Sequence, residues 1–147
     1  MTPEQTLIVR ETFAKVEPIS EAAAALFYGR LFELDPSLRP MFRGDMAEQG
    51  RKLMQTLAVV VHGLDRIATL VPAVEALGRR HAGYGVRDEH YATVASALLW
   101  TLEQGLGPAF TPAAREAWTA AYTLLATVMQ RAAAEATLEP HPIARVA

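Results

Sequence analysis

Apolar side chains recur along most of the chain at intervals of three and four residues, which places them on one face of an α-helix. No segment shows the strict alternation of apolar and polar residues that predicts a β-strand. We therefore expect an all-α protein. Early examples of the helical spacing are Leu7, Phe13, Val16, Ala24, Phe27, Leu31 and Phe32.

Capping residues and prolines divide this pattern into separate helices. Thr2-Pro3-Glu4-Gln5 carries a capping residue, then proline at the first helical position, then glutamine three residues after the cap. Pro18 ends this helix, and we expect Ser20 to cap the next one. Asp35-Pro36 starts a short helical turn that leads to Phe42.

Capping residues and glycines also divide the second half of the chain into separate helices. Asp45 is expected to cap a helix that runs to about His62, with an interruption at Gly63 and Asp65. A helix is then expected from Leu70 to His81.

We expect Asp88 to cap a long helix to about Gln104, and Thr111-Pro112 to open the last helix, to about Ala134. The sequence thus predicts a single domain over residues 1–147 with about seven helices, a core over about residues 5–134 and a frayed tail over residues 135–147.

The amino-acid composition excludes several classes of function for this chain. A chain of 147 residues is long enough to bury a substantial core, and its net charge of −2 does not favour nucleic acid or an anionic membrane. Cysteine is absent, which excludes disulfides, thiolate catalysis and covalent haem attachment through Cys-x-x-Cys-His. The longest apolar run, residues 57–61, is too short to span a membrane, and the polar N-terminus does not resemble a signal peptide. We expect a cytoplasmic protein.

His81 is the strongest candidate for chemistry. It follows Leu77-Gly78-Arg79-Arg80 and precedes Gly83-Tyr84-Gly85, so it is expected on the last turn of a helix. The carbonyl of Leu77 lies one turn back and can accept the proton of one ring nitrogen, which leaves the other nitrogen as a metal ligand. A helix-terminal histidine that only interacts with the helix dipole is the alternative.

Several segments together resemble the globin family over roughly residues 5–132. Pro40-Met41-Phe42 is similar to the corner at which globins place a phenylalanine against haem, and residues 77–81 are similar to the segment with the proximal histidine. Residues 106–112, with Trp118 and Tyr122, resemble the last turn and final helix of neuroglobins. Residues 49–54 resemble bacterial single-domain globins of the Hell's Gate type. The resemblance implies helices around one non-covalently bound haem b, with His81 as the iron ligand.

The resemblance also implies which residues surround the bound gas. Tyr28 and Gln49 fall at distal positions, where a phenol and an amide can both donate hydrogen bonds to dioxygen. We expect tight oxygen binding, and a five-coordinate ferrous iron because glutamine coordinates haem iron less readily than histidine does. A core tyrosine bonded to backbone and a solvated glutamine are the alternatives.

Other residues are expected around the porphyrin. Phe42 and Leu53 are assigned to the pocket wall, and Lys52 and Arg80 to the haem propionates, with ordinary core packing and solvated charges as the respective alternatives. The further lining candidates are Leu77, Tyr84, Val86, Tyr91, Val94, Tyr122 and Met129.

Tyr91 departs from the pattern of flavohaemoglobins in one respect. In that group the equivalent tyrosine pairs with a glutamate of the last helix, and Ala133 takes the place of that glutamate here. Glu135 lies two residues further on and points to another face of the helix. We therefore do not expect a strong peroxidase-like enrichment of the proximal histidine.

Four functions follow from these features. The first is reversible binding of dioxygen, nitric oxide and carbon monoxide, and the second is a nitric oxide dioxygenase. The second requires a separate reductase, because the 147 residues contain no Gly-x-Gly-x-x-Gly fingerprint. A haem-based gas sensor and a haem-free helical bundle that binds another protein are the remaining alternatives. We expect a monomer or a weak dimer.

Overall fold

Six α-helices and four short 3₁₀-helices make up the part of the chain that the computed structural model describes, residues 1–138. No β-strand occurs within these residues. The α-helices are α1 (Pro3–Val16), α2 (Ser20–Leu34), α3 (Met46–His62), α4 (Ile67–Gly83), α5 (Asp88–Leu106) and α6 (Pro112–Leu138). The 3₁₀-helices are η1 (Glu17–Ile19), η2 (Pro36–Met41), η3 (Leu64–Arg66) and η4 (Gly107–Ala109). The predicted all-α fold is confirmed.

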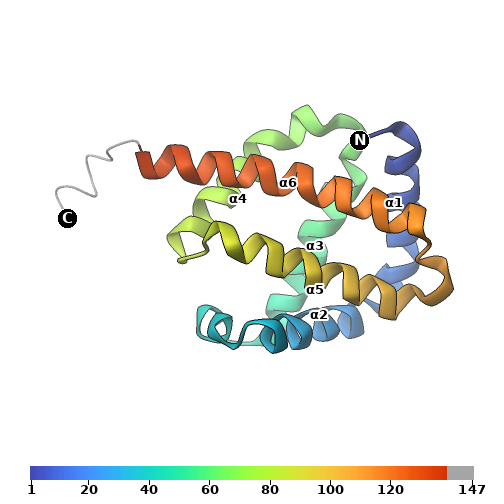
Figure 1. Cartoon of the computed structure of the whole chain (residues 1–147), viewed down its shortest axis with the longest axis horizontal. Helices are drawn as coiled ribbons and strands as arrows, with labels where there is room; N and C mark the ends of the chain where they lie inside the picture. The colour runs from blue at the N-terminus through green and yellow to red at the C-terminus, as the bar shows by residue number, and fades with distance from the viewer. Residues whose placement is uncertain (139–147) are drawn as a thin grey trace.

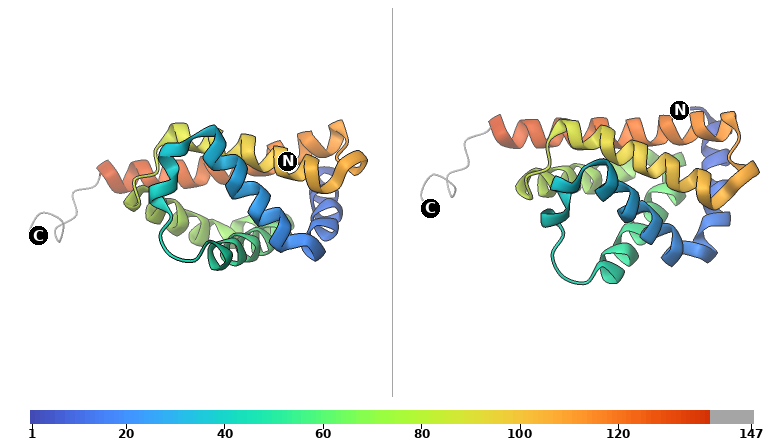
Figure 2. Two further views of the ribbon diagram at one scale, coloured as in Figure 1. Left: turned by 90° about the horizontal axis from the view of Figure 1, so that it is seen from below. Right: turned by 60° about the horizontal axis from the view of Figure 1, so that its bottom comes forward.

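The helices cross each other at steep angles, as Figure 1 shows. The longest helix, α6, packs along α4 and against α1, while α2 packs on α5 and crosses α3. Both ends of α3 meet other elements: the turn η3 joins it to α4 with a bend of 58°, and the loop of residues 42–45 joins it to η2. Figure 2 shows this loop spanning the side of the molecule on which α2 and α3 diverge.

Local sequence signals account for three of the six α-helix starts within residues 1–138. The Thr2 hydroxyl accepts a hydrogen bond from the Gln5 N–H at 3.1 Å, and the Gln5 side chain accepts one from the Thr2 N–H at 3.0 Å, so the predicted capping box forms. Asp45 accepts from the N–H of Ala47 at 2.8 Å, and Thr111 accepts from that of Ala114 at 3.1 Å. Each of these caps satisfies a backbone N–H that lacks a partner in the first turn of its helix.

Two predicted caps are wrong. Ser20 has helical backbone angles (φ −57°, ψ −38°) because η1 runs directly into α2, and the residue at the cap position is Ile19. Asp88 is the first residue of α5 and does not cap it. The ring nitrogen Nδ1 of His90 instead accepts the N–H of Arg87, the true cap residue, at 2.9 Å.

Two helices are longer than predicted. Helix α4 begins at Ile67, three residues before the expected Leu70, and contains Pro72. Proline has no N–H group, so only the carbonyl oxygen of Ala68, four residues before Pro72, loses its helical hydrogen bond. The helix continues past this position. Helix α6 continues past Ala134 to Leu138, four residues beyond the predicted end. Residues 139–147 of the predicted tail lie outside the described residues.

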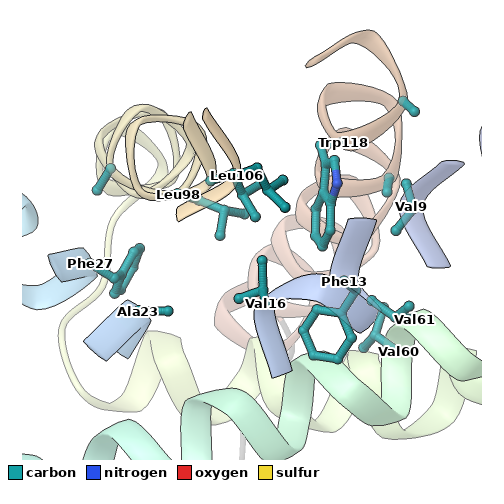
Figure 3. Packing of buried hydrophobic residues seen from close by; sticks show 14 of the residues in the cluster. Val9, Phe13, Val16, Ala23, Phe27, Val60, Val61, Leu98, Leu106 and Trp118 are labelled. Carbon is teal, nitrogen blue, oxygen red and sulfur yellow. The ribbon is translucent and has the colours of Figure 1, made fainter. Parts of the chain in front are cut away.

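The core lies where α1, α2, α3, α5 and α6 converge (Figure 3). Phe13 of α1 is central to it and sits between Trp118 of α6 and the pair Val60–Val61 of α3. The indole N–H of Trp118 donates to the Thr12 hydroxyl at 2.8 Å, which satisfies a polar group inside an apolar region. This packing fixes how α1 and α6 sit against the helices that carry the candidate site.

Among residues 1–138, no single helix is long and apolar enough to cross a membrane. The bent pair formed by residues 46–62 and 64–83 passes the same test of length and composition.

Candidate functional site

The imidazole of His81 is oriented by its own helix. Its Nδ1 lies 2.8 Å from the carbonyl oxygen of Leu77, as the four-residue spacing predicts. Burial is the main influence on the ring and lowers the pKa of His81, the bond to Leu77 raises it, and the charge of Arg80 lowers it. The ring is therefore neutral at pH 7, with a proton on Nδ1 and a lone pair on Nε2. These are the properties of a histidine that binds a metal through Nε2.

The turn after His81 is tightly organised. The carbonyl oxygen of His81 accepts hydrogen bonds from the N–H groups of Tyr84 and Val86, at 3.1 and 3.0 Å. Gly85 adopts a φ of +91°, which L side chains rarely adopt, and this allows the chain to turn toward α5. The position of His81 thus depends on hydrogen bonds on both sides of it.

Aromatic rings surround Tyr28, the second candidate, on α2. Its ring centroid lies 5.1 Å from that of Phe27, 5.2 Å from that of Phe42 and 6.1 Å from that of Phe32. Phe32 and Phe42 also contact each other, at 5.5 Å. Such clustering restricts the rotamers of the phenol and aims its hydroxyl in one direction.

The hydroxyl of Tyr28 interacts with Gln49 of α3. Burial raises the pKa of Tyr28, and a hydrogen bond from the Gln49 side chain partly offsets this. The phenol is therefore neutral at pH 7 and keeps a proton to donate. No backbone oxygen of residues 1–138 accepts a hydrogen bond from it, so the alternative of a core tyrosine bonded to backbone is not observed.

Small residues allow the helices of the site to approach closely. A Cβ on Gly50 would lie 2.9 Å from the Cβ of Ala24, where α3 crosses α2 one residue after Gln49. A Cβ on Gly78 would lie 2.4 Å from the carbonyl oxygen of Met129, where α4 crosses α6 one turn before His81. Sequence reasoning did not single out either glycine as a site residue, although both stand inside the motifs quoted above.

The remaining candidates occupy different environments. The half-buried apolar ones Phe42, Leu53 and Val94 pack against the core. Leu77 and Val86 are also half-buried, whereas Met129 is buried. Tyr84 is 65% exposed, with its ring centroid 6.2 Å from that of His81. Apolar side chains that remain half-buried suit the edge of a cofactor crevice.

The two predicted cations lie at the surface. Lys52 is exposed, and its Nζ is 3.9 Å from a carboxylate oxygen of Glu48, a long contact that contributes little. Arg80 is exposed, next to His81. Within residues 1–138, no group of three or more His, Cys, Asp or Glu side chains is arranged to bind a metal ion.

Tyr91 and Tyr122 join α5 to α6. The hydroxyl of Tyr122 donates to the carbonyl oxygen of Tyr91 at 2.7 Å. Burial raises the pKa of Tyr122 far above its ordinary value, and that of Tyr91 is raised by burial and by the nearby charge of Asp88. Asp88 in turn accepts a 3.4 Å contact from the Gln130 amide of α6. Tyr122 therefore positions helices through its hydroxyl.

A family model for globins matches residues 25–129, which include every candidate residue described above. The chain belongs to the globin family. The described fold is thus a globin fold, and His81 on α4, Tyr28 on α2 and Gln49 on α3 all lie within the matched residues.

Named relatives are of two kinds. This globin is 34% identical over 131 residues to a flavohemoprotein of Vibrio cholerae, an alignment that covers 87% of this chain and 33% of the relative. It is 30% identical to neuroglobin of Danio rerio over 138 residues, which cover 84% of this chain and 87% of the relative. The globin therefore spans about a third of the length of the flavohemoproteins that it matches.

Solved structures share the fold along nearly the whole chain. An engineered carbene transferase, named as a suspected nitric oxide dioxygenase from Rhodothermus marinus, is 27% identical, with a TM-score of 0.84 and coverage of 93% of this chain and 96% of the other. A bacterial globin from Campylobacter jejuni superposes with a TM-score of 0.82 at 24% identity, covering 94% of this chain and all of the other, and shows the fold alone.

Proposed function

We propose that this globin binds haem b through Nε2 of His81 and reversibly binds a diatomic gas, dioxygen foremost, beside Tyr28 and Gln49. The observation that carries the proposal is the 2.8 Å contact between Nδ1 of His81 and the Leu77 carbonyl. It fixes the tautomer and the ring orientation and increases the basicity of the other nitrogen. Globin membership and the flavohemoprotein relatives support the same cofactor.

The surrounding residues suit a flat, largely apolar group. Half-buried side chains on α3, α4 and α5 would line its faces, and Phe42 would contact its edge from the loop that follows η2. Attachment is non-covalent because the chain lacks cysteine. Arg80 and Lys52 are placed at the surface, where they can meet the propionates. When bound, haem supplies a ferrous iron to which dioxygen, nitric oxide or carbon monoxide coordinates.

Tyr28 and Gln49 act as hydrogen-bond donors toward the gas. The phenol stays protonated because burial raises its pKa, and the aromatic rings around it limit its reorientation. A donor that is already oriented loses little freedom when the gas arrives. We therefore infer high oxygen affinity through slow release. Gln49 orients Tyr28 by donating to the phenol oxygen and leaves the phenol proton for the ligand.

A second function, conversion of nitric oxide to nitrate, is favoured by the names of two relatives, a flavohemoprotein and a suspected nitric oxide dioxygenase. Each turnover of that reaction needs an electron, so a reductase partner is part of the proposal. Nitric oxide consumption by the purified globin should continue beyond one equivalent only when a flavin reductase with a nicotinamide donor is added. Stoichiometric consumption in both cases would leave gas binding as the function.

The binding proposal is tested by replacing the ligand histidine. Wild-type protein purified with haem is expected to show a Soret band and to bind carbon monoxide, and His81→Ala is expected to lose most of both. His62→Ala, at the exposed end of α3, is the matched control and should keep them. Equal haem content in His81→Ala and wild type, at equal helical content by circular dichroism, would overturn the proposal.

A further inference from the structure

The rings of Tyr28, Phe32 and Phe42 contact each other in pairs. Phe32 lies against the face of the phenol, with ring centroids 6.1 Å apart and ring planes inclined by 26°. Phe42 meets Tyr28 and Phe32 edge-on, at 5.2 and 5.5 Å, with interplanar angles of 66° and 65°. A change in the position of Phe32 would therefore open space beside the phenol and loosen its orientation.

Arg39 of η2 contacts this group of rings in two ways. Its guanidinium carbon lies 5.2 Å from the ring centroid of Phe32, within the range in which a cation is attracted to an aromatic face. Its backbone carbonyl oxygen accepts the N–H of Phe42 at 3.1 Å. One residue thus holds the ring that stacks on Tyr28 and the backbone of the ring that meets Tyr28 edge-on.

The backbone around Arg39 is anchored on its N-terminal side. The carboxylate of Asp35 accepts the N–H of Ser37 at 3.1 Å at the start of η2. Leu38, directly before Arg39, is buried. The guanidinium of Arg39 therefore extends from a segment whose own position is fixed by a cap and by core packing.

No carboxylate competes with Phe32 for this guanidinium. Arg39 is exposed, and none of the ion pairs of arginine and lysine among residues 1–138 includes it. A planar guanidinium stacks well on an aromatic face because it is weakly hydrated. Its observed partner within these residues is thus the ring that packs on Tyr28.

We propose that Arg39 is a positioning residue of the gas site, which holds Phe32 against Tyr28 and so keeps the phenol aimed at the gas. This inference rests on the proposed function, in which Tyr28 donates a hydrogen bond to the gas. Dioxygen draws negative charge from ferrous iron and gains from such a donor, whereas carbon monoxide draws little. Arg39 therefore slows the release of dioxygen and has little influence on carbon monoxide.

The kinetic test compares the release of two gases from the full-length, haem-loaded protein. Arg39→Met removes the cation and keeps an unbranched side chain, and we expect dioxygen release to become about threefold faster. Carbon monoxide release, measured by displacement with nitric oxide, should stay unchanged. Arg39→Lys keeps a cation and should fall between Arg39→Met and wild type. Arg43→Met makes the same charge change at an exposed residue whose side chain stacks on no ring within residues 1–138, and should alter neither rate.

Two further measurements show whether Arg39 acts through the phenol. In Tyr28→Phe protein, Arg39→Met should add no further acceleration of dioxygen release, because the donor is already absent. In the carbon monoxide complex, nuclear Overhauser contacts between the rings of Phe32 and Tyr28 should weaken in Arg39→Met and persist in Arg43→Met. The second measurement reports ring positions independently of gas release.

Several outcomes would overturn the proposal. These are an unchanged dioxygen release in Arg39→Met, an equal acceleration for both gases, an undiminished effect in Tyr28→Phe protein, and unchanged contacts between the two rings. A large effect of Tyr28→Phe with none of Arg39→Met would reject this inference alone. Dioxygen release at the wild-type rate in Tyr28→Phe would reject the proposed donor role as well, so the two failures are distinguishable.

Discussion

Tyr28 has a ring held by aromatic neighbours and a hydroxyl proton that no backbone group of residues 1–138 accepts. Phe27, Phe32 and Phe42 surround the ring, and Gln49 interacts with the hydroxyl. Most buried polar groups in proteins have a partner within the protein. A buried phenol whose neighbour is a flexible amide can instead direct its proton to a ligand. The residue thus connects the packing of α2 to the chemistry of the gas site.

Replacing this phenol tests its role directly. A hydrogen bond to a group that carries charge contributes roughly 1.5–3 kcal/mol. We expect Tyr28→Phe to release oxygen about tenfold faster or more, measured by stopped-flow displacement with carbon monoxide. Tyr84→Phe, which changes an exposed tyrosine, is the control and should not alter the rate. An unchanged rate in Tyr28→Phe would refute the donor role.

At the scale of helices, the crossing of α4 and α6 places His81. Gly78 lies three residues before the histidine, and a Cβ there would approach the carbonyl oxygen, Cα and carbonyl carbon of Met129 to 2.4, 2.6 and 2.8 Å. These atoms belong to the backbone of α6 and cannot move by a rotamer change. The helices can approach this closely only because residue 78 has no side chain.

Gly78→Ala should therefore push α4 away from α6. Overpacking of this kind costs roughly 1–3 kcal/mol in the free energy of unfolding. We expect that loss in urea denaturation, together with faster transfer of haem to apomyoglobin, because His81 moves with its helix. Gly83→Ala is the matched control on α4, since a Cβ there meets nothing within 4 Å. Equal stability and haem loss in both variants would show that the crossing does not position His81.

Across the whole molecule, buried and half-buried tyrosines make the stability depend on pH. The pKa values of Tyr28, Tyr91 and Tyr122 are all raised, in each case chiefly by burial. In the unfolded chain these phenols release their protons near pH 10, roughly the ordinary pKa of tyrosine. Above that pH the folded state binds more protons than the unfolded state, so the free energy of unfolding falls as pH rises. Their contribution is fully present below about pH 10.

We expect the free energy of unfolding to decline above about pH 10, and Tyr122→Phe to make that decline shallower. Each phenol that stays protonated in the folded state contributes a slope of up to about 1.4 kcal/mol per pH unit. The variant should also be less stable at pH 8, because it lacks the bond to the Tyr91 carbonyl. Urea titrations at pH 8, 10 and 11 measure both effects, and parallel curves for variant and wild type would contradict the first.

The helix caps show which structural features can be predicted from neighbouring residues in the sequence. Thr2, Asp45 and Thr111 cap their helices as predicted, because each bond joins residues two or three positions apart. Ser20 and Asp88 fail because a neighbouring element or side chain takes the cap position first: η1 continues into α2, and His90 accepts the Arg87 N–H. The sequence shows which residues can cap, but competition among them depends on the chain that surrounds them.

The amino-acid sequence alone determined the helical class, most helix boundaries and the bond between His81 and Leu77, because these depend on contacts within one or two turns. Tertiary structure decided which distant residues meet: Tyr28 with Gln49 and Phe42, and Gly78 with the backbone of Met129. Those contacts depend on how closely and at what angle helices cross, and the pattern along a single helix carries no information on that crossing.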